Sequence, residues 1–179
     1  ASPEKALAAL VADVRADGFN ADTMGYIPES FYTASTAAGR PAAMQAELGG
    51  AFSSLAYTTL GWGEWDRGGA SASLEPAPPR VDVFKWLQRR RMTTVVRRGD
   101  TNRTDALQTA WFNGVGYVAW ENVWGRWNEI SPRDGELLAR VRLLLHYFGA
   151  RGFLHAEGWE PHSPVAAAGV FASRFPLQE

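Results

Sequence analysis

The sequence predicts an α/β fold that forms part of a (β/α)8 barrel of the TIM type, with about four to five strand–helix units. Two observations lead to this prediction. Short runs with strand character alternate with longer amphipathic runs, which is typical of parallel strands with helices packed outside them. The chain has 179 residues, 46% of them hydrophobic, whereas a complete barrel needs ~250 residues as a rule. The sequence therefore predicts half a barrel, its C-terminal half.

The first predicted element is a helix. Ser2 has the character of an N-cap, Pro3 that of a first helical residue and Glu4 that of a first-turn acid. Apolar residues follow at helical spacing: Leu7, Leu10, Val11 and Val14. Gly18 ends this run, and residues 18–24, short and bounded by turn residues, are predicted to form a strand.

The same order then repeats. Residues 30–38 are predicted to form a helix that ends at Gly39, and residues 42–48 a second strand. A helix is also expected over residues 51–60, although its apolar face is poorly marked. Residues 61–80 are rich in Gly, Ala, Ser and Pro, and a segment of this length without an element suggests a functional loop.

The second half continues the alternation. Residues 83–87 are expected to be a short helix, and residues 92–96 have the strongest strand propensity in the chain. A helix over residues 101–113 and a strand over residues 115–120 follow. The clearest helix begins at Ser131 and ends at Gly149, with an apolar stripe of Leu137, Leu138, Val141, Leu144, Leu145 and Phe148.

The character of the chain changes near its C-terminal end. Residues 153–156 are predicted to be a final barrel strand, whereas residues 169–175 alternate like a strand with one solvated face. We therefore expect residues 1–160 to be the half barrel and residues 161–179 to be a linker and a strand of something else.

Composition excludes several classes of function. The absence of cysteine rules out disulfides and thiol catalysis, and a net charge of −1 gives no electrostatic reason to expect nucleic acid. No apolar run is long enough for insertion into a membrane, and neither a dinucleotide nor a P-loop pattern is present, so no cofactor is expected. Metal-ligand residue types gather at His155, Glu157, Glu160 and His162. Their irregular spacing does not predict a metal site.

Carboxylates lie at or just beyond the carboxyl ends of four of the predicted strands: Asp22, Glu47, Asp100 and Glu121. Because the carboxyl ends of barrel strands share one mouth, these side chains are the candidate catalytic residues. Two facing carboxyl groups, one ionised and one protonated, are the minimum for hydrolysing a glycosidic bond. Each has a structural alternative, such as capping a turn or binding an arginine.

Eight tryptophans are unusual for this length. Flat aromatic faces stack on sugar rings, although core packing accounts equally well for many of them. The candidate substrate-binding residues are the amides and indoles near the carboxylates: Asn20, Trp62, Trp65, Trp120, Asn122 and Trp124.

Four segments carry a resemblance to a known family. Residues 18–24, with Asp22 after a Gly-aromatic pair, and residues 45–49, with Glu47 at the acidic end of the next strand, resemble strands of glycoside-hydrolase-like barrels. Residues 112–128 resemble a late strand and loop of barrels from large secreted proteins of this type. In those proteins a β-sandwich follows the barrel, which implies that residues 169–176 are its first strand. The family's nucleophile and acid positions fall on Asp22 and Asp100.

The resemblance implies a glycoside-hydrolase-like fragment that acts on or binds a carbohydrate, outside the cell or at its surface. The alternative is a non-catalytic structural or carbohydrate-binding component of a larger extracellular assembly. In either case other chains, or further segments of the same protein, are expected to complete the barrel. A domain that binds a phosphorylated metabolite ranks behind both, because the chain lacks the glycine-rich loop. The sugar, the linkage and the stereochemistry stay open.

Overall fold

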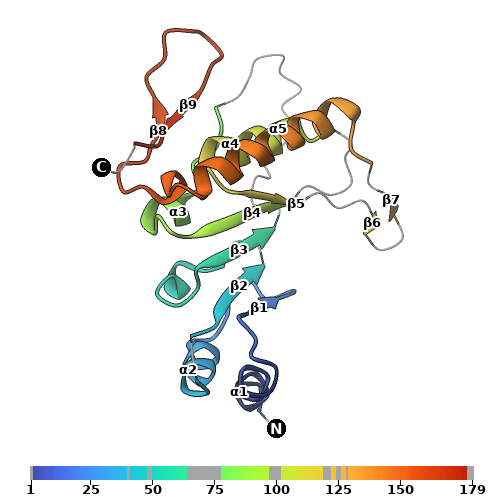
Figure 1. The fold of residues 1–179 in the computed structure, drawn as a ribbon, viewed down its shortest axis with the longest axis vertical. Helices are drawn as coiled ribbons and strands as arrows, with labels where there is room; N and C mark the ends of the chain where they lie inside the picture. The colour runs from blue at the N-terminus through green and yellow to red at the C-terminus, as the bar shows by residue number, and fades with distance from the viewer. Residues whose placement is uncertain are drawn as a thin grey trace. The chain divides into compact units, whose positions relative to one another are not determined.

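The protein is a mixed α/β structure of parallel strands flanked by helices (Figure 1). The computed structural model describes residues 2–39, 41–47, 50–63, 78–96, 102–118, 122–123, 126–127 and 129–176. The chain divides into two compact units, Ala1–Gly63 and Glu64–Glu179. The α/β class predicted from the sequence is confirmed.

The first unit contains three parallel strands. Its elements are α1 (Pro3–Val14), β1 (Gly18–Ala21), α2 (Glu29–Ala37), β2 (Ala43–Glu47), the 3-10 helix η1 (Phe52–Ser54) and β3 (Leu60–Gly63). β1 pairs with β2 and β2 with β3, both in parallel. The parallel pairing predicted for the strands that precede Asp22 and Glu47 is therefore confirmed.

The core of the first unit lies on one face of this sheet. Met44 and Ala46 of β2 are buried together with Val11 of α1 and Ile27. Phe19 of β1 and further partly buried side chains, Ala21, Phe31, Tyr32 and Ala38, pack against this cluster. Figure 1 shows α1 and α2 side by side on the same side of β1 and β2. Because strand side chains alternate, the residues between the core positions face the other way.

The second unit contains a parallel pair and two hairpins. Its elements are α3 (Val83–Leu87), β4 (Met92–Val96), α4 (Thr104–Asn113), β5 (Gly116–Val118), β6 (Asn122–Val123), β7 (Arg126–Trp127), α5 (Pro132–Gly149), the 3-10 helix η2 (Phe153–His155), β8 (Glu160–Ser163) and β9 (Ala172–Arg174). β4 and β5 are parallel, whereas β6–β7 and β8–β9 are antiparallel.

Helix α4 covers the β4–β5 pair. Ala106 and Ala110 of the helix are buried against Val95 and Val115. The Asp134 carboxylate of α5 accepts hydrogen bonds from the backbone N–H of Arg103, at 2.8 Å, and from the hydroxyl of Thr104, at 2.7 Å. These bonds tie the start of α4 to the first turn of α5 because both donors precede or open α4.

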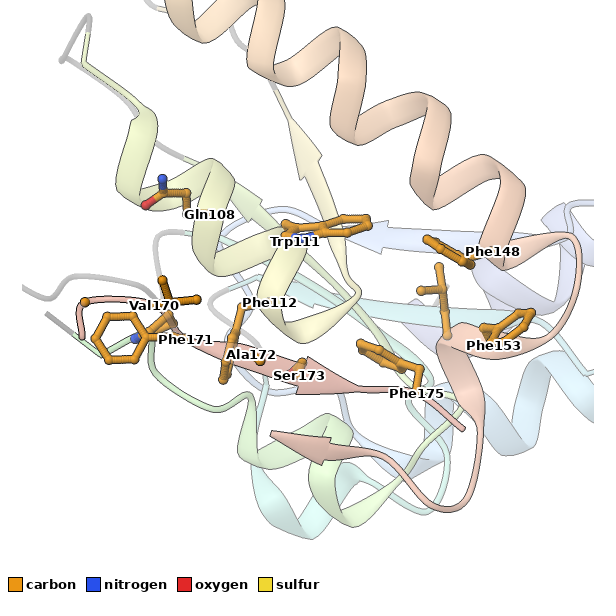
Figure 2. A pocket seen from close by; sticks show the side chains of 13 residues that line it. Gln108, Trp111, Phe112, Phe148, Phe153, Val170, Phe171, Ala172, Ser173 and Phe175 are labelled. Carbon is orange, nitrogen blue, oxygen red and sulfur yellow. The ribbon is translucent and has the colours of Figure 1, made fainter. Parts of the chain in front are cut away.

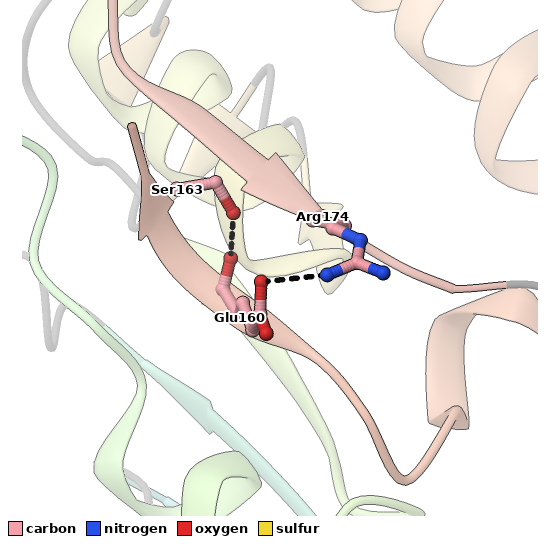
Figure 3. Close-up of polar contacts among 3 residues, drawn as sticks. All are labelled: Glu160, Ser163 and Arg174. Carbon is pink, nitrogen blue, oxygen red and sulfur yellow. Dashed lines mark hydrogen bonds and ion pairs between the residues drawn. The ribbon is translucent and has the colours of Figure 1, made fainter. Parts of the chain in front are cut away.

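The β8–β9 hairpin closes the described chain. Glu160 is in register with Arg174, and the two side chains form an ion pair of 3.1 Å (Figure 3). The Ser163 hydroxyl donates to the backbone carbonyl of Glu160 at 2.9 Å. Residues 169–175, predicted to be a strand, thus contain β9, whereas its partner β8 was not anticipated. The following β-sandwich stays a prediction.

Two predicted elements are wrong. Residues 153–156 are not a barrel strand, because Gly152 adopts a left-handed φ of 76° and the next residues form the 3-10 helix η2. Residues 51–60 do not form the expected long helix, because only Phe52–Ser54 of this segment are helical, as the 3-10 helix η1. The hydroxyls of Ser54 and Thr58 donate to backbone carbonyls of Ala51 and Ser54, which competes with regular helical bonding. β3 begins at Leu60, the last residue of the expected helix, and continues to Gly63 inside the segment that was expected to be a loop.

Candidate functional site

Two amide side chains meet on the sheet face opposite the helices of the first unit. Asn20 of β1 is in register with Gln45 of β2. The Asn20 Nδ2 group donates to Gln45 Oε1 at 2.8 Å. Asn20 is exposed and Gln45 half-buried, so this pair borders solvent. Each amide supplies both donors and an acceptor, which suits recognition of hydroxyl groups.

Glu47 extends this polar row to the carboxyl end of β2. It lies two residues beyond Gln45 and therefore on the same face. The Glu47 carboxylate accepts a hydrogen bond of 2.5 Å from the backbone N–H of Thr23. Thr23 adopts a left-handed φ of 62°, in the turn directly after β1. That turn folds back toward β2 and fixes the orientation of the carboxylate.

Asp22 lies in the same turn as Thr23 and is exposed. The turn is held by a bond from Met24 N–H to the carbonyl of Ala21, at 3.3 Å, and the Glu47 N–H donates to the Met24 carbonyl at 3.0 Å. Asp22 directly follows β1, and Glu47 is the last residue of the neighbouring parallel strand β2, so both lie at the carboxyl end of this strand pair.

Trp62 of β3 shares the face of Glu47. The two residues are in register across the parallel β2–β3 pair, so their side chains project to the same side. Trp62 is buried, with 6% of its surface exposed. Its ring is therefore not an open plate for a sugar in this conformation.

For the remaining predicted site residues the structure describes no side chain. Asp100, Glu121, Trp65, Trp120 and Trp124 lie outside the described residues. Asn122 begins the short strand β6, for which the backbone alone is described. The convergence of all four carboxylates on one mouth is therefore still a prediction. Asn20, Asp22, Glu47 and Trp62 are the predicted residues that the structure places on the first unit.

Sequence reasoning missed two members of this group, Gln45 and Thr23. The spacing could have revealed Gln45, because it precedes Glu47 by two residues within a predicted strand. Thr23 contributes through its backbone N–H, for which no side-chain pattern gives a signal.

The described part of the chain contains no group of three or more His, Cys, Asp or Glu side chains placed to hold a metal ion. None of its helices is long and apolar enough to cross a membrane.

No family model matches the chain, and it matches no curated protein and no solved structure.

Proposed function

We propose that the protein binds a carbohydrate on the polar face of β1 and β2, as part of a glycoside-hydrolase-like barrel. The observation that carries this proposal is the row formed by Asn20, Gln45 and Glu47. These side chains lie next to one another, opposite the helix-covered face and toward the carboxyl end of parallel strands. Active sites of (β/α) barrels are built at this end.

The arrangement of the first unit supports a barrel. In the first unit the strands are neighbours in chain order, and both helices pack on one face. A doubly wound sheet has helices on both faces, whereas a barrel keeps them outside and encloses the other face. An enclosed face with amides and a carboxylate is suited to a polar ligand.

Hydrolysis would use the two carboxyl groups at this edge. Glu47 is held by the Thr23 N–H, and Asp22 lies in the adjoining exposed turn. In a glycosidase one carboxylate attacks or orients water while the other group protonates the leaving oxygen. We assign these two roles to the Asp22–Glu47 pair without choosing between them.

A non-catalytic carbohydrate-binding component is the second candidate. The hydrogen bond from the Thr23 N–H favours this non-catalytic candidate. That bond occupies a carboxylate oxygen of Glu47 that a catalytic role would use on the substrate or on water. In both cases we propose an extracellular or cell-surface setting and further chains or segments that complete the barrel. The support for this setting is the resemblance of residues 18–24 and 112–128 to secreted barrels.

The test is a binding and hydrolysis screen with soluble cello-, xylo-, chito- and malto-oligosaccharides. Isothermal titration should reveal one class that binds, and Asn20→Ala and Glu47→Gln should weaken that binding by about tenfold or more. Asp13→Asn, an exposed change on α1, is the control and should bind like the unchanged chain.

The formation of hydrolysis products distinguishes the enzyme from the non-catalytic binding protein. In an active enzyme, Asp22→Asn should abolish hydrolysis and leave the affinity for the sugar and the unfolding transition unchanged, because the change is nearly isosteric. Binding without hydrolysis would support the non-catalytic candidate. If no oligosaccharide binds, or if Asn20→Ala and Glu47→Gln bind as well as Asp13→Asn, the polar row is not a carbohydrate site.

A further inference from the structure

A pocket of about 620 Å³ lies within the second unit, remote in sequence from the polar row (Figure 2). Figure 2 shows α4 on one side of it and the segment that leads through β9 on another, with the end of α5 and η2 beside them. Six aromatic side chains line it: Trp111, Phe112, Phe148, Phe153, Phe171 and Phe175. The volume falls within the range of small-molecule sites, ~300–1,000 Å³.

The aromatic rings come from separate elements and are held at fixed angles. Trp111 of α4 lies 6.1 Å from Phe148 of α5, with ring planes inclined by 41°. Phe148 in turn meets Phe153 of η2 edge-on, at 5.4 Å and 70°. Tilted pairs of this kind are favourable packing geometries. The wall is therefore built by tertiary contacts between three elements.

The opposite wall is anchored as well. Phe175 stacks on Trp159, with centroids 5.8 Å apart and planes inclined by 13°. The Trp159 Nε1 group donates to the hydroxyl of Ser173 at 3.2 Å. These contacts hold the segment that contains Phe171 and Ala172 against the rest of the pocket.

The polarity of the lining restricts the ligand. None of the described lining residues carries a formal charge, and their polar side chains are Gln108 and Ser173. A charged ligand would lose its hydration without gaining a counter-charge. A sugar would leave most of its hydroxyl groups without a partner. An apolar ligand with one hydrogen-bonding group meets neither penalty.

We propose that this pocket binds a neutral, largely apolar small molecule that contains an aromatic ring. Tilted phenyl and indole faces on several sides provide the edge-to-face contacts that such a ring prefers. The hydroxyl of Ser173 or the amide of Gln108 hydrogen-bonds its single polar group. The site is separate from the proposed carbohydrate face, because all of its described lining residues belong to the second unit.

The test uses the fluorescent probe N-phenyl-1-naphthylamine, a neutral aromatic amine, titrated into the whole chain. We expect saturable, one-site fluorescence enhancement. Ala172→Trp places an indole in the pocket and should weaken the probe's affinity by about tenfold or more. Ala167→Trp adds the same side chain at an exposed position of the same hairpin outside the lining, and should bind like the unchanged chain.

Val170→Trp provides a second variant in case Ala172→Trp unfolds the chain, because Val170 lines the pocket but is 50% exposed. Dodecanoate, an anionic acyl chain, should not displace the probe. The proposal is overturned if binding is not saturable or if the folded lining variants bind like Ala167→Trp. Efficient displacement by dodecanoate would also overturn it, because that result excludes a neutral aromatic ligand class.

Discussion

Gly18 occupies a position where β1 and β2 approach too closely for a side chain. A Cβ atom there would lie 2.8 Å from the backbone oxygen of Ala43, which cannot move without disturbing the strand. We expect Gly18→Ala to lower the free energy of unfolding by about 1–3 kcal/mol. Gly135→Ala is the matched control. It lies in α5 with no atom near the added methyl, so it should raise stability by about 0.5–1 kcal/mol.

Urea unfolding of both variants measures this difference. If Gly18→Ala is as stable as the unchanged chain, Gly18 does not approach the Ala43 backbone this closely. The register that places these two residues opposite each other would then be wrong.

Lys85 is a buried cation whose titration should appear in the pH dependence of stability. Its Nζ group donates to the backbone carbonyl of Gly114 at 2.9 Å, and 1% of the residue is exposed. Burial lowers the pKa of Lys85 from 10.5 to about 8, against the opposing attraction of Asp82. Between these two values the unfolded chain binds a proton that the folded chain does not, so stability rises with pH.

Comparison with Lys85→Met isolates this effect from other titrating groups. From pH 8 to pH 10.5 the unchanged chain should gain up to about 3 kcal/mol relative to the variant. Below pH 8 the difference should be constant. A flat difference across the whole range would show that Lys85 titrates normally and is hydrated.

The junction of α4 and α5 depends on one side chain, Asp134. Burial disfavours its charge, but hydrogen bonds from Thr104, the Arg103 N–H and Ser131 outweigh burial and hold its pKa below the ordinary value of 3.8. In Asp134→Asn the amide NH2 replaces one acceptor oxygen and points at one of these donors, which loses its hydrogen bond. The substitution should therefore lower the free energy of unfolding by about 1–3 kcal/mol. Asp105→Asn, exposed in the first turn of α4, should change it by at most about 0.5 kcal/mol.

Acid titration supplies the second readout. Because the folded pKa is lowered, the stability from the Asp134 carboxylate is complete above pH 3.8 and disappears as the pH falls through the folded value. The difference between the unchanged chain and Asp134→Asn should therefore shrink below pH 3.8. If it does not, the junction does not depend on the carboxylate charge.

The sequence predicted two helices that begin at a serine cap, and both are present. The Ser2 hydroxyl accepts from the Lys5 N–H and the Ser131 hydroxyl from the Asp134 N–H, both local bonds that a short motif determines. β3 was missed because two of its four residues, Gly61 and Gly63, have low strand propensity. The Asn20–Gln45 bond joins residues 25 positions apart. Such a contact depends on strand register, which tertiary packing determines.

The apolar stripe of α5 shows the same limit. Its periodicity predicted one inward face, and Val141 of that stripe is buried. Leu144 of the same stripe is 45% exposed, and Leu143 beside it is 61% exposed. Helical spacing therefore identified the helix and its apolar face. How much of that face is buried depends on which other elements are available to cover it.

Each of the two units keeps apolar surface in contact with solvent. Val14 of α1 is 66% exposed, and Leu143 of α5 similarly so. β1 pairs with β2 and lies at the end of the described strand order. Unpaired strand edges and apolar patches favour association. We therefore expect the chain to self-associate as its concentration rises, which is also what the proposed half barrel predicts.

Sedimentation velocity over a wide range of protein concentration tests this self-association. Adding charge with the double variant Val14→Glu, Leu143→Glu should shift the equilibrium toward monomer. A monodisperse monomer that unfolds in a single cooperative transition at every concentration would contradict the expectation and count against the half barrel.

The β8–β9 hairpin is held together at its base, so a peptide can be inserted at its tip. The Glu160–Arg174 ion pair and the Trp159–Phe175 stack both lie at the base, whereas residues 164–168 are exposed. Inserting a flexible peptide between Ala166 and Ala167 would lengthen a loop whose closure entropy rises by only ~0.6 kcal/mol per doubling. The tip can therefore accept an epitope or an affinity tag. Because Val170 and Phe171 follow within a few residues, a reporter inserted there would sit next to the aromatic pocket.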